Sequence, residues 1–118
     1  MGHWHDVAAG LAEPTRSLRQ AIPDAWGGFS QLHREAMKEG ALSAALKEVI
    51  ALAIAVKAEC DGCITYHARG AARKGATPEQ VAEALGVALL MSGGPGTTWA
   101  PRAWEAYQEY FSEQPAQG

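Results

Sequence analysis

Hydrophobic residues recur at intervals of three and four along much of the chain, and glycine or proline separates the segments that show this pattern. From Asp24 to Glu39 the apolar residues share one helical face, with Pro23 before the segment and Gly40 after it. This pattern predicts an amphipathic helix. A short helix is expected ahead of it, around Thr15 to Ile22, and residues 1–14 are expected to be frayed.

The segment after Gly40 predicts a helix that is apolar on every side. Ser43 is the expected N-cap, and the helix is expected to end near Ala58. The hydrophobic residues between these positions surround the helix axis rather than forming a stripe. Such a helix belongs in a core or at a subunit interface.

Two more helices are predicted in residues 61–92. The first covers residues 61–74 and is stopped by Gly75, because glycine readily adopts the left-handed conformation that ends helices. The second begins with a capping-box pattern: Thr77 is the N-cap, Pro78 lies at the first helical position, and Gln80 follows three residues after the cap.

The stretch SGGPG at residues 92–96 ends that helix, and residues 100–111 predict a last one. Trp104, Tyr107 and Phe111 lie at helical spacing in it and are expected to pack together. No segment alternates apolar and polar residues as a strand does, so the fold class is predicted to be all-α. We expect one domain over residues 1–118, with a frayed end at residues 112–118.

Composition narrows the classes of partner. Hydrophobic residues make up 47% of the 118 residues and charged residues 19%, which is typical of a globular protein. The formal net charge is -3 and the basic residues are scattered, so nucleic acid is not an expected partner. The longest apolar run, residues 49–56, is too short to cross a membrane, so no membrane partner is expected. The N-terminus lacks the pattern of a secretory signal, so a cytoplasmic location is expected.

Both cysteines lie in the segment ECDGCITYH, residues 59–67. If this region is helical, Cys60 lies exposed at the N-terminal edge, Cys63 about one turn inside and His67 one turn further, all on one face. The two cysteines can then form a reversible disulfide, and His67 can exchange a proton with the Cys63 thiol. The amide groups and dipole at the helix N-terminus favour thiolate over thiol.

Glu48 is the expected partner of His67. If the two helices joined near Glu59 are antiparallel, Glu48 lies opposite residues 67–69. A carboxylate in an otherwise apolar helix needs a polar partner, so Glu48 is predicted to orient His67 or to relay its proton.

Metal binding is the main alternative for these residues. Cys60, Cys63 and His67 could supply three zinc ligands, but the chain has no second cysteine pair, and His33 would have to fold across as the fourth ligand. We therefore expect neither a metal nor an organic cofactor. His3 and His5 are ascribed to a flexible terminus rather than to a copper or nickel site.

The candidate residues follow a fixed spacing: a glutamate, eleven intervening residues and then Cys-x-x-Cys-x-x-x-His, here Glu48, Cys60, Cys63 and His67. This pattern resembles the AhpD-like alkylhydroperoxidases of the carboxymuconolactone decarboxylase superfamily. The resemblance extends over residues 45–107. It implies a helical bundle that assembles into a homo-oligomer, a trimer or hexamer, and a cysteine pair that reduces peroxides. The decarboxylase branch lacks this pair. Related peroxidases carry histidine just before the second cysteine, where this chain has Gly62.

The resemblance implies a thiol-dependent peroxidase, with peroxiredoxin activity, in antioxidant defence. The catalytic residues would be Glu48, Cys60, Cys63 and His67, acting on a small hydroperoxide, with a dithiol or a protein as electron donor. Cys63 is the expected peroxidatic residue because it lies one turn from His67, with Cys60 as the resolving residue; the reverse assignment stays open. The alternative function is a redox-sensing or zinc-binding oligomeric protein without peroxidase turnover.

Overall fold

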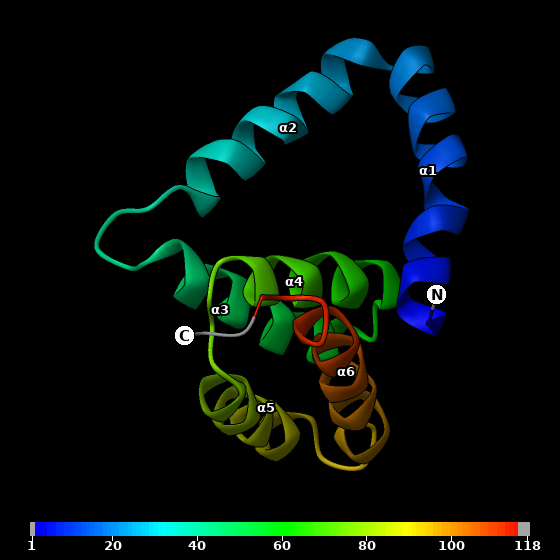
Figure 1. The fold of residues 1–118 in the computed structure, drawn as a ribbon. Helices are drawn as coiled ribbons and strands as arrows, with labels where there is room; N and C mark the ends of the chain where they lie inside the picture. Colours follow the sequence, from blue (N-terminus) through cyan, green and yellow to red (C-terminus); the bar gives the residue numbers. More distant parts are fainter. Residues whose placement is uncertain (1, 116–118) are drawn as a thin grey trace.

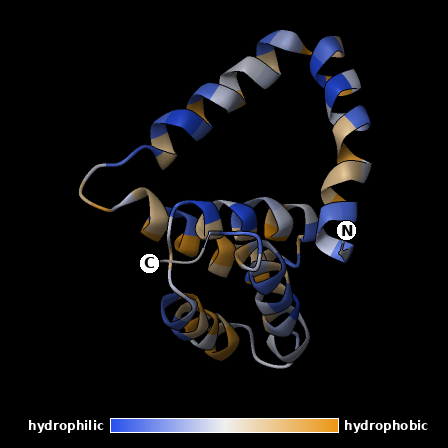
Figure 2. Cartoon of the chain, viewed as in Figure 1, coloured by the Kyte–Doolittle hydropathy of each residue, from blue (hydrophilic) through white to orange (hydrophobic). Residues whose placement is uncertain are grey.

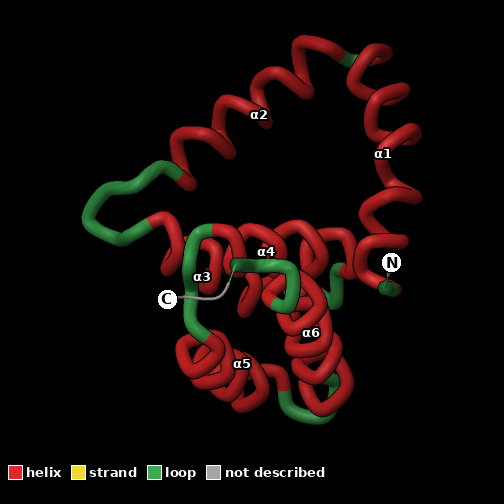
Figure 3. The backbone as a smooth tube through the Cα atoms, viewed as in Figure 1, coloured by secondary structure: helices red, strands yellow, loops and turns green. Residues whose placement is uncertain are grey.

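The computed structural model describes residues 2–115, and in this range every regular element is a helix and none is a strand (Figure 3). The predicted all-α fold is confirmed. The helices are α1 (His3–Ala21), α2 (Pro23–Met37), α3 (Ala44–Ala58), α4 (Asp61–Arg73), α5 (Pro78–Ser92) and α6 (Gly96–Phe111).

Helices α3, α4, α5 and α6 pack together as a bundle, and α1 and α2 form an arch that stands away from it (Figure 1). The core lies between the four bundle helices, and the N-terminal end of α1 adds Trp4 to it. Its largest fully buried side chains are Trp4, Tyr107, Tyr110, Leu52, Ile64, Val56, Val81 and Thr65.

Helices α3, α4 and α5 begin and end close to the predicted signals. The Ser43 hydroxyl accepts the Leu46 N–H at 3.1 Å at the start of α3. At the start of α5, Thr77 and Gln80 cap each other's backbone N–H groups, as a capping box requires. Gly75 has a φ of 92° after α4, a conformation that glycine adopts without steric cost.

Apolar residues cover more of α3 and α5 than the bundle buries. Val49 and Leu52 of α3 lie in the core, whereas Ile54 is 62% exposed. On α5, Leu90 is 78% and Met91 69% exposed. Figure 2 shows these apolar segments on helices that also contribute to the core. Faces of this kind are unusual on a monomer.

Helix α1 is much longer than predicted. The expected short helix around residues 15–22 and frayed residues 1–14 are wrong, because the helix begins at His3 and Trp4 is only 2% exposed. The Trp4 indole N–H donates to Glu105 at 2.8 Å, and the backbone N–H of Trp4 donates to Glu109 at 3.1 Å. His5, expected in a flexible terminus, is also held by Glu109 and contacts Glu113 at 2.8 Å.

Helix α2 confirms the amphipathic helix predicted in this region, yet none of its residues is buried. Its apolar residues Phe29 and Leu32 are 62% and 64% exposed. The C-terminal end of α2 is tied to α3, because Lys47 Nζ donates to the carbonyls of Ala36 at 2.9 Å and Lys38 at 2.5 Å. The arch is therefore attached to the bundle at both ends (Figure 1). Between these ends, the apolar side chains of Phe29 and Leu32 are exposed.

Helix α6 begins at Gly96, four residues before the predicted start, and Pro101 lies inside it. The predicted packing of its aromatic residues is confirmed: Tyr107 is fully buried and stacks with Trp104 and Phe111. The Tyr107 hydroxyl donates to the Ala76 carbonyl at 2.6 Å. Burial, with a smaller contribution from the charge of Glu79, raises the pKa of Tyr107 to about 12.

Residues 112–114 donate backbone hydrogen bonds to the end of α6, so they are not the frayed end that was expected. Residues 116–118 lie outside the described part of the chain. Across residues 2–115, no helix has the length and apolar character needed to cross a bilayer.

Candidate active site

The turn between α3 and α4 positions the cysteine segment. Helix α3 ends at Ala58, and Glu59 adopts a left-handed conformation with a φ of 55°. The backbone N–H groups of Glu59 and Cys60 donate back to carbonyls of the last turn of α3, so this helix end is closed. The chain reverses within a few residues, and α4 packs against α3.

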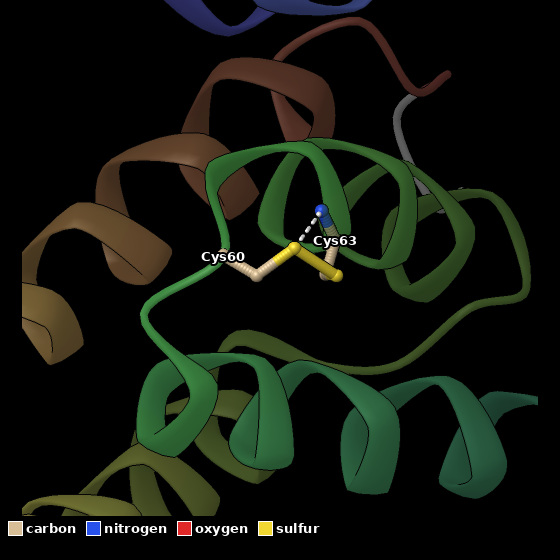
Figure 4. The surroundings of a disulfide bond; sticks show 2 residues. All are labelled: Cys60 and Cys63. Carbon is tan, nitrogen blue, oxygen red and sulfur yellow. Dashed lines mark hydrogen bonds between the residues drawn. A yellow bond between two sulfur atoms is a disulfide. The ribbon is translucent and has the colours of Figure 1, made fainter. Parts of the chain in front are cut away.

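Cys60 and Cys63 are joined by a disulfide, with their Cα atoms 5.2 Å apart (Figure 4). Cys60 is the N-cap of α4, and its sulfur accepts the backbone N–H of Cys63 at 3.2 Å. This contact, together with the helix dipole, favours negative charge on the Cys60 sulfur when the pair is reduced. Cys60 was expected to be exposed, but both cysteines are half-buried.

Glu48 and His67 lie in direct contact, as the antiparallel register predicted. His67 Nδ1 is 2.9 Å from Glu48 Oε2, and the two side chains are 22% and 12% exposed. An ionised carboxylate only accepts hydrogen bonds, so Nδ1 carries the proton and donates it. In the neutral imidazole this leaves Nε2 as a base.

Gly70 provides the space that Glu48 occupies. A Cβ added at Gly70 would overlap the whole carboxyl group of Glu48, with even its more distant oxygen, Oε1, at 2.8 Å. Because Cys63, His67 and Gly70 are spaced by four and three residues on α4, they form one stripe, and Glu48 shows that this stripe faces α3. Sequence reasoning did not single out Gly70, although an isolated glycine inside a helical segment is a signal for close packing.

Gly62, the position of the histidine in related peroxidases, is covered by α1. A Cβ at Gly62 would lie 3.1 Å from Leu11 Cδ1. A larger side chain there would have to displace Leu11. The docking of α1 against α4 therefore gives a physical reason for glycine at this position.

A hollow of about 520 Å³ opens beside His67, lined by α4 residues, by Glu48 and by His33 of α2. The His33 and His67 rings lie nearly parallel, with their centroids 6.4 Å apart. Tyr66 lines the hollow. Trp99 does not line it and lies under the guanidinium of Arg102, on α6.

Metal ligands do not converge here. In the part of the chain that the structure describes, no three His, Cys, Asp or Glu side chains are grouped so as to hold a metal ion. What the four predicted residues offer is a disulfide-bonded sulfur pair at a helix start and, on the same helix, an imidazole whose tautomer is fixed by a carboxylate. Their catalytic roles remain predictions.

Comparisons with known proteins agree with the observed fold. The family model described as "Carboxymuconolactone decarboxylase family" matches residues 23–106. A crystal structure of a carboxymuconolactone decarboxylase family protein from Legionella pneumophila, in its apo form, is 36% identical. It superposes with a TM-score of 0.88, and the match covers 92% of this chain and 96% of that one.

Two curated relatives carry no assigned activity in their names. An uncharacterised protein of Cupriavidus necator is 42% identical over 101 residues, which cover 83% of this chain and 89% of the relative. Uncharacterised protein 4 of the cox locus of Paracoccus denitrificans is 37% identical over 103 residues, or 87% and 89% of the two chains. The family match over most of the chain and the shared fold lead to one conclusion: this protein belongs to the carboxymuconolactone decarboxylase family.

Proposed function

We propose that this protein is a thiol-dependent peroxidase of the AhpD-like type, which reduces small hydroperoxides through Cys60 and Cys63 and serves in antioxidant defence. The observation that carries the proposal is the pairing of a disulfide at the start of α4 with the Glu48–His67 hydrogen bond of 2.9 Å between α3 and α4. A purely structural role for this disulfide is a poor alternative, because a bridge across only two intervening residues restrains very little of the chain.

The first step is attack by the Cys63 thiolate on one oxygen of the peroxide. An S–O bond forms, the O–O bond breaks, and the alkoxide takes up a proton and leaves as an alcohol. Cys63 is then a sulfenic acid. His67 Nε2 is the base that takes the thiol proton and returns it to the alkoxide, and Glu48 holds the imidazole through Nδ1.

The second step closes the disulfide. The Cys60 sulfur attacks the sulfenic sulfur of Cys63, an S–S bond forms, the S–O bond breaks, and hydroxide leaves as water with a proton. In total the two thiols lose two electrons and two protons, and the peroxide becomes an alcohol and water. A dithiol donor, either a small molecule or a protein, returns two electrons and two protons to restore both thiols.

The two cysteines differ in a way that suits these roles. Cys63 lies one helical turn from His67, whereas Cys60 receives the Cys63 N–H, which stabilises its thiolate. An attacking resolving thiol needs such stabilisation near neutral pH.

Single-cysteine variants test the order of events. The reduced Cys60→Ser variant is expected to form a sulfenic acid on Cys63 when mixed with one equivalent of hydroperoxide, detected by dimedone labelling and mass spectrometry. The Cys63→Ser variant is expected to show no such labelling. Both variants are expected to lose steady-state turnover with a dithiol reductant, because neither can form the disulfide.

The outcomes separate the candidate roles. Unchanged peroxide consumption by Cys63→Ser would exclude the proposed mechanism, and labelling confined to Cys63→Ser would assign the peroxidatic role to Cys60. If the wild type consumes no peroxide with any dithiol but cycles between dithiol and disulfide, the protein is a redox sensor rather than a peroxidase.

A further inference from the structure

Three cationic side chains line the hollow beside His67, and the proposed peroxidase steps use none of them. It is lined by Arg69, Arg73 and Lys74. Among the described residues the only carboxylate in its lining is Glu48, which is bonded to His67. The chain as a whole has a formal net charge of -3, so this concentration of cations is local.

In the described part of the chain, these three cations have no partner of opposite charge. Within residues 2–115, none of them lies within 4.0 Å of a carboxylate oxygen of Asp or Glu. The other close ion pairs of the described chain involve different residues: His5 with Glu109 and Glu113, Arg16 with Glu13, and Lys38 with Glu35. Unpaired cations around a concave surface raise the local concentration of anions.

Arg69 is held in a defined position. Its guanidinium lies over the ring of Tyr66, 5.2 Å from the ring centroid, and its side chain is half-buried. Together with Arg73 it also lines a neighbouring hollow of about 380 Å³ beneath α1. A planar guanidinium that is fixed in this way suits a carboxylate or phosphate, which it can bind through two parallel hydrogen bonds.

From these contacts we propose that the hollow binds the carboxylate or phosphate group of a small molecule, with Arg69 and Arg73 as its main ligands. Its volume of about 520 Å³ is within the range of small-molecule sites. Neither cysteine lines the hollow. The reacting end of such a molecule would extend along α4 past His67 to Cys63, about 9 Å from Arg69 at the helical rise per residue.

Only one part of this proposal rests on the proposed function, namely that the bound anion is the peroxide substrate. The binding itself can be measured without turnover. The oxidised full-length protein is titrated with hexanoate, with inorganic phosphate and with hexanol, and the imidazole signals of His33 and His67 are followed by NMR. Hexanoate or phosphate is expected to shift both imidazoles in a saturable way, and hexanol is not.

Charge-removing variants identify the ligands. Arg69→Gln combined with Arg73→Gln is expected to weaken anion binding at least tenfold. Arg102→Gln is the matched control, because Arg102 also lies over an aromatic ring, 4.6 Å from the centroid of Trp99, but outside the hollow. Equal shifts with hexanoate and hexanol, or equal weakening by Arg102→Gln, would overturn the proposal. If the double variant fails to fold, the two single variants are compared in the same titration.

Kinetics then separate a substrate from a free anion. The ratio of kcat/KM for a fatty-acid hydroperoxide to that for its methyl ester is expected to fall about tenfold in the double arginine variant and to stay constant in Arg102→Gln. A constant ratio in all variants, with anion binding lost in the double variant, would mean that the anion bound is not the substrate. If neither peroxide is turned over, the proposed function is contradicted. The NMR titration alone then tests the anion site.

Discussion

Gly70 determines where the carboxylate of Glu48 can lie. The Glu48 side chain fits between α3 and α4 because position 70 has no Cβ, and from there it bonds His67 Nδ1. The atoms that a Cβ would meet belong to the far end of a flexible side chain, so the chain can relieve the overlap by turning Glu48 away. A one-carbon change could therefore break the pair and leave the fold intact.

Gly70→Ala is expected to separate Glu48 from His67 with little net change in the free energy of unfolding. The helix preference of alanine stabilises the fold by about 0.5–1 kcal/mol, and the loss of the Glu48–His67 hydrogen bond costs a similar amount. The ¹⁵N shifts of the His67 ring should report a mixture of tautomers, and kcat/KM for hydroperoxide should fall at least tenfold. Gly86→Ala is the matched control, since Gly86 lies in α5 with open space around its Cα. Retention of the wild-type His67 tautomer in Gly70→Ala would contradict this account.

The Glu48–His67 pair could be predicted, whereas the closeness of Gly70 could not. Two antiparallel helices joined by a short turn leave little choice of register, so residue numbers alone placed Glu48 opposite His67. The room for a carboxylate depends on the interaxial distance, which follows from packing over both helices. The hydrogen bond from Cys63 N–H to Cys60 depends on the N-cap conformation of Cys60 and was likewise not predicted.

At the scale of helices, α1 is held by contacts from the far end of the chain. Gly2, its N-cap, supplies no side-chain cap, and Glu109 of α6 instead accepts the backbone N–H groups of Trp4 and His5, at 3.1 and 2.8 Å. Glu109 also accepts from the His5 ring. A carboxylate from another helix thus satisfies N–H groups that a helix normally leaves free at its start.

This arrangement predicts a dependence of stability on pH. Burial alone would raise the pKa of Glu109, but the hydrogen bonds from His5 and Trp4 and the charge of His5 lower it below its ordinary value of 4.5. A depressed pKa in the folded state means that the stabilisation is present above pH 4.5 and is lost as the pH falls through the folded value. Glu109→Gln is expected to cost about 1 kcal/mol at pH 7 and progressively less below pH 4.5, measured by urea unfolding.

The control is Glu113→Gln, because Glu113 contacts the His5 ring but none of the α1 backbone N–H groups. Its cost should be smaller at pH 7. A Glu109→Gln cost that does not change between pH 7 and pH 3 would show that the charge of Glu109 contributes nothing to the docking of α1.

Local signals predicted the bundle helices and missed the extent of α1. Ser43, Thr77 and Gly75 act within a few residues of themselves, so their effects can be read from the sequence. The partners of Trp4 lie about one hundred residues away, and Pro14 inside α1 argues locally against a long helix. The start of α6 was also placed too late: the helix begins at Gly96, and Pro101 lies inside it, although proline is most common in the first turn of a helix.

For the molecule as a whole, the exposed apolar faces of α2, α3 and α5 predict association with further copies of the chain. Leu32, Ile54 and Leu90 are each more than 60% exposed. The sequence predicted that α3 would need a second apolar surface, and the bundle covers only one side of it. The resemblance to AhpD-like proteins makes a trimer or hexamer the expected assembly.

Analytical ultracentrifugation at micromolar concentration is expected to give a mass that is a multiple of the 12.5 kDa chain. Leu90→Lys should lower this mass, because it places a charge on an apolar contact surface. Gln108→Lys, at an exposed polar position of α6, should not. A wild-type protein that sediments as a single chain would exclude the predicted assembly.

The bond between Trp4 and Glu105 has a consequence for the order of folding. Helix α1 leaves the ribosome about one hundred residues before its docking partners on α6. The bundle can begin to form before α1 and α2 have docked, and during this time Phe29 and Leu32 are accessible to other chains. Leu11 covers Gly62 only when α1 is docked, so the cysteine end of the site is complete only once α1 is in place.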